Sequence, residues 1–210
     1  MPVMETVSTS EIERLREALS KFALRIAPEG QPFTLASGRE SRIYFDVKQV
    51  TLAPEVFLTI GELVREQCYA YGATAVGGLA AGAIPIAMAV VAREAMEGST
   101  KVRSFYVRDK KTHGIKESLY QAFDEGHPSG IISAESTAVV VDDVLTTGNS
   151  IGEATREILS RGARVSAIVV LVDRGEGGAQ ALRKEFRVPV VAIFRMDDRG
   201  NLSFLGGEVY

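Results

Sequence analysis

Two adjacent acids and a hydroxyl-rich glycine turn form the segment of this 210-residue chain best suited to chemistry. Asp142 and Asp143 follow an apolar run at 138–141, and the turn Thr-Thr-Gly comes at 146–148. Backbone N–H groups at the carboxyl end of a strand, together with the next helix's N-terminus, bind phosphate well. Adjacent carboxylates repel each other unless they meet hydroxyl groups or a cation. The segment therefore predicts a sugar phosphate site.

Other interpretations of this segment remain open. The acids could simply end a strand while residues 147–150 cap a helix, as Asn and Ser often do. Nucleoside triphosphate and dinucleotide sites are disfavoured, because the chain has neither Gly-Lys-Ser/Thr nor Gly-x-Gly-x-x-Gly after a strand.

The elements around this segment alternate between strand and helix. Near-continuous apolar runs at 138–141 and 167–172 are typical of strands buried on both faces, as in a parallel sheet. The expected fold class is α/β, with a central, mostly parallel sheet flanked by helices. Two short strands are expected between 33 and 50. The other expected strands are 73–78, 103–108, 137–141, 164–172 and 188–194, and the expected helices are 10–25, with Ser10 as N-cap, 54–71, 85–97, 150–161 and 179–186.

The length predicts a single domain. Residues 1–52 are expected to contribute a small hood lobe, and residues 53–210 the core. Residues 110–136 lack periodicity and contain three glycines and a proline, which indicates an irregular loop or hairpin. Because long loops in compact domains often act as lids, a mobile loop is expected near 108–130.

The composition limits the classes of partner and the location that are expected. A net charge of −3 gives no general attraction for nucleic acid or an anionic membrane, and we expect neither as a partner. The single cysteine, Cys68, cannot form an intramolecular disulfide. No apolar run reaches the roughly 18 residues that a membrane helix needs. A soluble, cytoplasmic protein is expected.

The strand, acid pair and Thr-Thr-Gly turn resemble the phosphoribosyl-diphosphate-binding motif of the type I phosphoribosyltransferases. The resemblance implies a transfer of ribose 5-phosphate to a base nitrogen. It also implies a Mg²⁺ ion held mainly through the diphosphate, with the two acids nearby. By position, the resemblance assigns a set of residues to the binding of phosphoribosyl diphosphate, the donor of the ribose 5-phosphate unit. They are Asp142, Asp143, Val144, Leu145, Thr146, Thr147, Gly148, Asn149 and Ser150.

Segment 33–46 resembles the amino-terminal segment of the orotate phosphoribosyltransferase family, and the likeness extends to about residue 178. The resemblance implies that Ser37 and Gly38, through their backbone, and the aromatic pair Tyr44 and Phe45 bind orotate, with Thr146 also in contact. Alternatively, the segment is a plain hairpin that packs both aromatic rings into the core.

Segment 105–114 resembles the family's basic catalytic loop, which ends in Lys-x-His-Gly. The resemblance implies that Arg108, Lys110, Lys111 and His113 bind phosphoribosyl diphosphate. Lys111 and His113, with Asp142 and Asp143, would be catalytic, since cations stabilise charge on the leaving diphosphate. It also implies a homodimer in which loop 108–114 completes the neighbouring active site. Alternatively, the lysines are solvated and the histidine occupies a turn. The spacing is one residue shorter than in the family, so either Asp109 or Lys110 takes the second basic position.

Segment 171–178 resembles the family's Asp-Arg-x-Glu-Gly-Gly stretch. The resemblance implies that Arg174 pairs with the orotate carboxylate or a ring carbonyl, because a guanidinium suits such a planar partner. Alternatively, Arg174 forms a strand-end salt bridge with Asp173. Two positions depart from the family: Ala36 stands where many members have lysine, and the turn 77–85 has no lysine. The diphosphate would then depend on backbone amides of residues 78–83, Mg²⁺ and the basic loop.

Together these segments predict the conversion of orotate and phosphoribosyl diphosphate to orotidine 5′-phosphate and diphosphate, in de novo pyrimidine biosynthesis. Three alternatives stay open: the same transfer to a purine or uracil, a regulator that only senses phosphoribosyl diphosphate, and a plain α/β scaffold. The aromatic pair, the basic loop and Arg174 together favour orotate.

Overall fold

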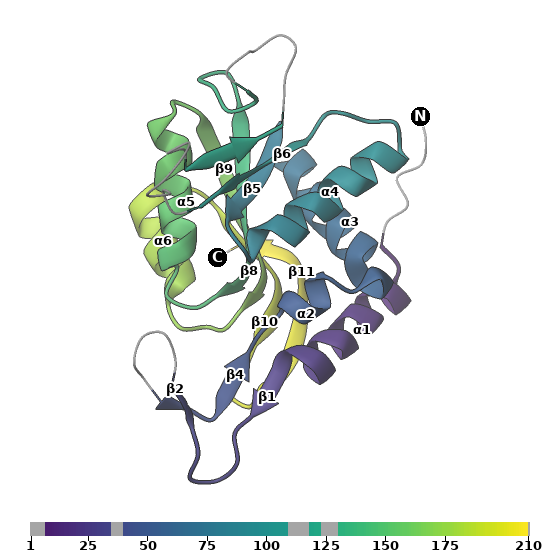
Figure 1. Ribbon diagram of the computed structural model, residues 1–210, viewed down its shortest axis with the longest axis vertical. Helices are drawn as coiled ribbons and strands as arrows, with labels where there is room; N and C mark the ends of the chain where they lie inside the picture. The colour runs from purple at the N-terminus through teal and green to yellow at the C-terminus, as the bar shows by residue number, and fades with distance from the viewer. Residues whose placement is uncertain (1–6, 35–39, 109–117, 123–129, 210) are drawn as a thin grey trace.

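The computed structural model describes residues 7–34, 40–108, 118–122 and 130–209, and Figure 1 shows their arrangement. The helices are α1 (Thr9–Ala18), the π-helix η1 (Leu19–Ala23), α2 (Lys48–Thr51), α3 (Pro54–Ala70), α4 (Ala83–Met96), α5 (Asn149–Ser160) and α6 (Gly178–Phe186). The strands are β1 (Leu24–Ile26), β2 (Phe33–Thr34), β3 (Glu40–Ser41), β4 (Ile43–Phe45), β5 (Ala75–Leu79), β6 (Arg103–Val107), β7 (Leu119–Gln121), β8 (Thr137–Leu145), β9 (Arg164–Asp173), β10 (Val190–Met196) and β11 (Leu202–Val209).

A seven-stranded sheet organises the chain, in the order β11-β10-β9-β8-β5-β6-β7. The five central strands run parallel to one another, while β11 and β7 pair antiparallel at the two edges. The expected mostly parallel sheet is thereby confirmed. The carboxyl ends of β5 and β8, which are neighbours, meet at the same edge, where ligands of open α/β sheets bind.

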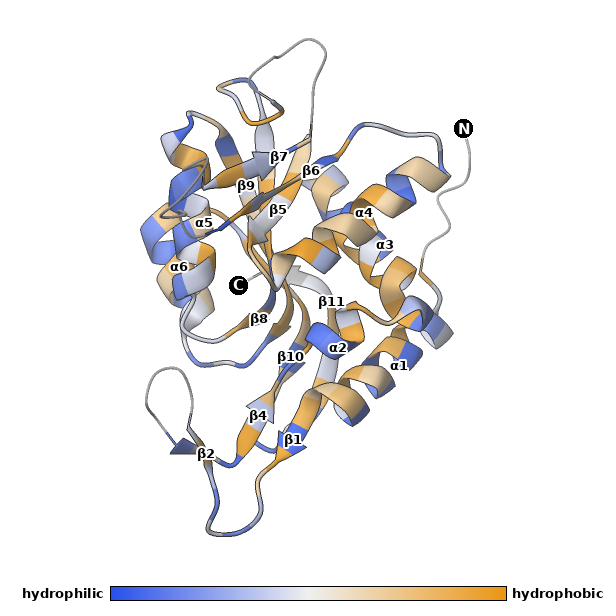
Figure 2. Cartoon of the chain, in the orientation of Figure 1, coloured by the Kyte–Doolittle hydropathy of each residue, from blue (hydrophilic) through white to orange (hydrophobic). Residues whose placement is uncertain are grey.

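The core lies on both faces of this sheet, because successive strand residues point to opposite sides. Val139 and Val141 of β8 belong to the cluster that includes residues of α3 and α4. Val140 belongs to the second cluster, with residues of α5 and α6. Figure 2 shows apolar residues along the central strands and hydrophilic residues on the outer surfaces of α5 and α6.

The amino-terminal region differs from the expectation in two respects. Helix α1 is capped by Ser8 rather than Ser10, since Ser8 accepts a hydrogen bond from the Glu11 N–H and the Glu11 carboxylate accepts one from the Ser8 N–H. The expected helix 10–25 is also too long, because its last residues pair as β1 with β4. The two short strands expected after residue 33 are present, together with β3 between them.

Two strands differ from the predicted sheet: β8 is longer than predicted, and β11 is an additional strand. β8 continues through both acids to Leu145, because Asp142 and Val144 still pair with β9. β11 was not predicted, since its polar residues and two glycines obscure the strand pattern. Residues 119–121 pair with β6 as a hairpin, one of the two forms expected for 110–136. Within the described ranges, no helix combines the length and the apolar character needed to cross a membrane.

Gly77 and Gly78 of β5 allow the central strands to approach one another. A Cβ atom on Gly77 would lie 2.0 Å from the Phe105 carbonyl oxygen, and one on Gly78 would lie 2.0 Å from the Val141 carbonyl oxygen. Both distances are far below contact, so only glycine fits. Strand packing therefore accounts for these two glycines.

Candidate functional site

The acid pair lies buried near the end of β8. Asp142 and Asp143 are 8% and 6% exposed. The Asp142 carboxylate accepts a hydrogen bond from the Asp143 N–H (3.0 Å), and the Asp143 carboxylate accepts one from the Val144 N–H (2.9 Å). Burial, followed by the charge of Asp143, raises the pKa of Asp142 well above its usual value. Two carboxylates held in this way are poised to accept hydrogen bonds or to lie beside a cation.

The turn between β5 and α4 lies directly against the two acids. It contains a cis peptide bond between Ala80 and Ala81. A Cβ atom on Gly82 would lie 2.5 Å from Oδ1 of Asp143 and 2.7 Å from Oδ1 of Asp142. Only a glycine backbone can come this close. The turn whose amides are expected to bind diphosphate and the carboxylates expected near the ribose therefore form one surface.

Lys48, at the start of α2, is a site residue that the sequence did not reveal. Its ammonium nitrogen lies 3.4 Å from Oδ2 of Asp143 and 3.5 Å from Oδ1 of Asp46. Burial alone would lower the pKa of Lys48, but the two carboxylates outweigh it and raise that pKa. The ion pair joins segments 95 residues apart, so no local pattern could have predicted it.

The Thr-Thr-Gly turn follows β8 and leads into α5. Gly148 adopts φ 86°, a left-handed conformation that favours glycine. No side chain caps α5, which rules out the alternative that Asn149 or Ser150 serves as a helix cap. Both of these residues and Thr147 are exposed, whereas Thr146 is half-buried. The turn and the first amides of α5 are thus available to an anion.

Arg174 follows β9 beside this turn. Its N–H donates to the Leu145 carbonyl (3.0 Å), and the Gly178 N–H donates to the Thr146 carbonyl (3.0 Å). The Arg174 side chain is 13% exposed, and its guanidinium pairs with Glu176 at 3.2 Å. This pair replaces the alternative salt bridge with Asp173, whose carboxylate accepts the Gly175 N–H. Among the described residues, the buried Nε of Arg174 has no hydrogen-bond partner.

Tyr44 and Phe45 point in different directions, as neighbours in a strand must. Tyr44 is 39% exposed, with its ring 5.5 Å from that of Phe33. Phe45 is 7% exposed and belongs to the core. The hairpin alternative thus holds for Phe45, while the ring of Tyr44 is open to a ligand. Contact of either ring with orotate stays a prediction.

The remaining predicted residues lie mainly outside the described ranges: Ser37, Gly38, Lys110, Lys111 and His113. Arg108 is described. Its N–H donates to the Ser118 carbonyl (2.8 Å), and its guanidinium lies 5.9 Å from the centre of the Tyr120 ring. The β6–β7 hairpin thus fixes the residue from which the basic segment starts.

The acid pair suits Mg²⁺ in one particular mode. Mg²⁺ is commonly held by one or two carboxylates plus substrate phosphates. Asp142 and Asp143 supply such a pair beside the Gly82 turn. In the part of the chain that the structure describes, no group of three or more His, Cys, Asp or Glu side chains could hold a metal. A pair of carboxylates beside a turn of backbone amides fits an ion that arrives with a diphosphate.

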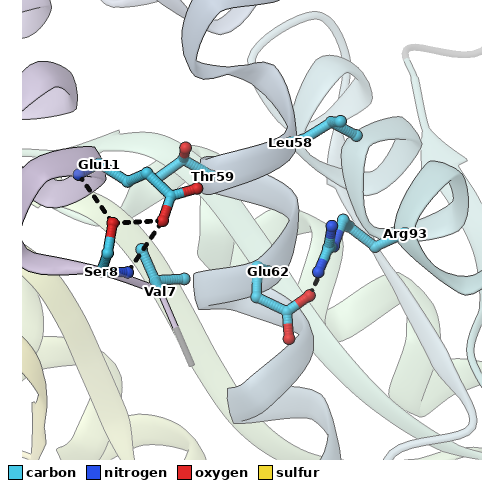
Figure 3. Close-up of a pocket in the computed structure, with 7 residues that line it drawn as sticks. All are labelled: Val7, Ser8, Glu11, Leu58, Thr59, Glu62 and Arg93. Atoms are coloured by element: carbon cyan, nitrogen blue, oxygen red, sulfur yellow. Dashed lines mark hydrogen bonds and ion pairs between the residues drawn. The ribbon is translucent and has the colours of Figure 1, made fainter. Parts of the chain in front are cut away.

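A hollow among α1, α3 and α4 is shown in Figure 3. It measures about 360 Å³ and is lined by residues that include Glu11, Thr59 and Arg93. Two of the lining residues are joined, since the Arg93 guanidinium donates a hydrogen bond to the Glu62 carboxylate at 2.7 Å. The acid pair, Lys48 and Arg174 do not line it, so the hollow is separate from the candidate site.

Comparison with known proteins agrees with this geometry. Residues 47–195 match the phosphoribosyl transferase domain. Orotate phosphoribosyltransferase of Aquifex aeolicus is 33% identical over 189 residues, covering 90% of this chain and 97% of that protein. Orotate phosphoribosyltransferase of Bradyrhizobium sp. strain ORS 278 is 38% identical over 149 residues, covering 70% and 77%.

Solved structures show the same fold. A phosphoribosyltransferase from Corynebacterium diphtheriae superposes with a TM-score of 0.70 at 27% identity, covering 89% of this chain and 96% of that one. Mycobacterium tuberculosis orotate phosphoribosyltransferase in complex with phosphoribosyl diphosphate superposes at 0.66 with 26% identity, covering 87% and 94%. The family predicted from the acid pair and its turn is confirmed: this chain belongs to the phosphoribosyltransferases and, among them, to the orotate phosphoribosyltransferases.

Proposed function

We propose that the protein transfers ribose 5-phosphate from phosphoribosyl diphosphate to orotate, forming orotidine 5′-phosphate and diphosphate in de novo pyrimidine biosynthesis. One observation carries this proposal: the acid pair lies between the Gly82 turn and Lys48, at the sheet edge where the Thr-Thr-Gly turn begins. That edge presents carboxylates for a ribose, amides for its phosphates and a nearby guanidinium for a planar anion. The relatives named orotate phosphoribosyltransferase support the choice of base.

Each group has a separate task in this reaction. The turn 146–148 and the uncapped start of α5 hold the 5-phosphate, and the acids accept hydrogen bonds from the ribose hydroxyls. Mg²⁺, bound through the diphosphate, would neutralise charge on the leaving group. Lys111 and His113 would do the same from the basic loop. Arg174, which has a free buried N–H, pairs with the orotate carboxylate or a ring carbonyl.

We also propose a homodimer in which segment 108–114 completes the partner's site. The face formed by α4, β6 and β7 suits the contact, since it carries a largely apolar hollow of about 250 Å³. Met88 on this face is 42% exposed, and the rings of Tyr106 and Tyr120 stack 5.0 Å apart. Arg108 extends from the same hairpin. A cytoplasmic location is proposed as well, consistent with the lone buried Cys68.

The proposed function is tested by following orotate absorbance with phosphoribosyl diphosphate and Mg²⁺, beside adenine, hypoxanthine, xanthine and uracil. We expect consumption of orotate alone. Consumption of a different base would keep the donor site and refute the assignment of Tyr44 and Arg174. Binding of phosphoribosyl diphosphate without turnover of any base would instead favour the regulatory alternative.

Replacing Lys111 with alanine should lower kcat by roughly a hundredfold or more, because a cation that stabilises the departing diphosphate is lost. The KM for orotate should change little, since this role concerns the leaving group. Steady-state kinetics at saturating orotate measure both quantities. Lys184→Ala, on the exposed face of α6, is the matched control. Normal turnover in Lys111→Ala would refute the catalytic role of this lysine.

A further inference from the structure

Lys48, at the start of α2, places a positive charge beside Asp143 and Asp46. It stands three residues after Phe45 and begins the one-turn helix α2. Its backbone N–H donates to Oδ1 of Asp46 (3.2 Å), and the Thr51 hydroxyl donates to the Lys48 carbonyl (3.1 Å). Val50 and Thr51 are buried, which anchors the turn. The backbone from which the Lys48 side chain extends is therefore held in place.

The charge of phosphoribosyl diphosphate gives a cation at this position a role. Phosphoribosyl diphosphate must place a multiply charged group on the Gly82 turn, and that turn touches both carboxylates of the acid pair. Like charges at this spacing repel strongly in a partly buried site. The turn contributes no lysine of its own. Among the described residues, Lys48 is the cation paired with either acid of the pair.

The ammonium also has capacity for one more acceptor. A lysine ammonium has three N–H donors, and Asp143 and Asp46 lie near two of them. The side chain is 52% exposed, whereas that of Asp143 is 9% exposed. One N–H of this half-exposed side chain therefore remains available to a further acceptor.

We propose that Lys48 is a donor-binding residue, whose ammonium offsets the charge of Asp143 and Asp46 and donates a hydrogen bond to the diphosphate of phosphoribosyl diphosphate. This inference rests on the proposed function and extends it by assigning the cation that the glycine turn lacks. Because the interaction concerns the diphosphate, its loss weakens the donor and free inorganic diphosphate alike, and leaves orotate nearly unaffected.

The test compares Lys48→Met and Lys48→Arg with wild type. Lys48→Met keeps the side-chain length without the charge, and we expect a roughly ten- to hundredfold rise in the KM for phosphoribosyl diphosphate, as for loss of a charged hydrogen bond. The Kd for inorganic diphosphate with Mg²⁺, measured by calorimetry, should rise by a similar factor. The KM for orotate should change less than about threefold, and Lys48→Arg should recover most of the donor affinity.

Lys184→Met, which removes an exposed lysine from α6, controls for the change in net charge and should behave as wild type. Thermal unfolding of each variant identifies loss of fold, and Lys48→Arg retains a cation if Lys48→Met does not fold. Unchanged affinity for diphosphate in Lys48→Met, or an equal rise in the KM values of both substrates, would overturn the assignment. A wild-type protein that consumes no orotate would contradict the proposed function instead, and the diphosphate titration would still decide the role of Lys48.

Discussion

Arg65→Met should lower the free energy of unfolding by about 3–5 kcal/mol, the usual cost of removing one partner from a buried ion network. Arg65 is fully buried on α3, and its guanidinium donates to Glu62 (2.8 Å) and Glu97 (2.5 Å). A third carboxylate, that of Glu94, lies 3.7 Å away. Without Arg65, Glu62 and Glu97 keep Arg93 as their cationic partner among the described residues, whereas the ion pair of Glu94 is lost. Urea unfolding measures the loss.

The network around Arg65 is held tightly from both sides. Glu94 also accepts hydrogen bonds from the Ser99 hydroxyl (2.6 Å) and the Lys101 N–H (2.9 Å), so it joins α4 to the chain that leads into β6. Burial alone would lower the pKa of Arg65, but its hydrogen bonds to Glu97 and Glu62 outweigh that effect and raise the pKa. Arg65 therefore stays charged at any pH at which the protein folds.

The exposed pair Arg156–Glu185, also at 2.8 Å, provides the matched control. Arg156→Met should cost no more than about 1 kcal/mol, because water already solvates both of its charges. An Arg65→Met variant no less stable than Arg156→Met would show that the buried network is energetically neutral.

Asp142→Asn should abolish most activity and yet stabilise the fold. Turnover should fall by roughly a hundredfold, since a charged acceptor for the ribose is lost. Asparagine can still accept the Asp143 N–H through its side-chain oxygen, so the local geometry survives. The variant removes a charge that burial and Asp143 both disfavour. Donor kinetics and urea unfolding test the two effects, and the double change with Asp143→Asn should also weaken the use of Mg²⁺.

The stabilisation should depend on pH in a defined direction. The pKa of Asp142 is raised in the folded state, so the folded protein holds that proton more tightly than the unfolded chain does. Its contribution to stability is present below the unfolded pKa and is lost as pH rises through the folded pKa. The advantage of Asp142→Asn should therefore grow as pH rises from about 4. Asp198→Asn, an exposed acid, should show no such trend. A constant difference across pH would contradict the argument.

Much of this fold follows from local patterns in the chain. Apolar runs such as 138–141 and 167–172 mark central strands, because both faces of a parallel sheet are covered. The acid pair and the Thr-Thr-Gly turn are contiguous, so the family could be predicted from this one segment. The end of β8 was placed too early, since ladder pairing with β9 outweighs the low strand propensity of aspartate.

The rest depends on contacts between distant segments. Lys48 pairs with Asp143, which lies 95 residues further along the chain, and no local sequence pattern predicts this contact. β11 is stabilised by pairing with β10 rather than by its own composition. The different environments of Tyr44 and Phe45 arise from which face of β4 meets the core, and a sequence pattern without the neighbouring elements cannot decide that.

The two main-chain hydrogen bonds from Arg174 and Gly178 to Leu145 and Thr146 have a bearing on redesign. Bonds between backbone atoms do not depend on side-chain identity, so the frame around the Thr-Thr-Gly turn would survive replacement of the Arg174 guanidinium. The backbone thus links the residue proposed to bind the base to the turn proposed to bind the sugar phosphate, while the side chain at position 174 can change independently. A catalyst with altered base preference could be sought at position 174 while the donor half of the site is kept intact.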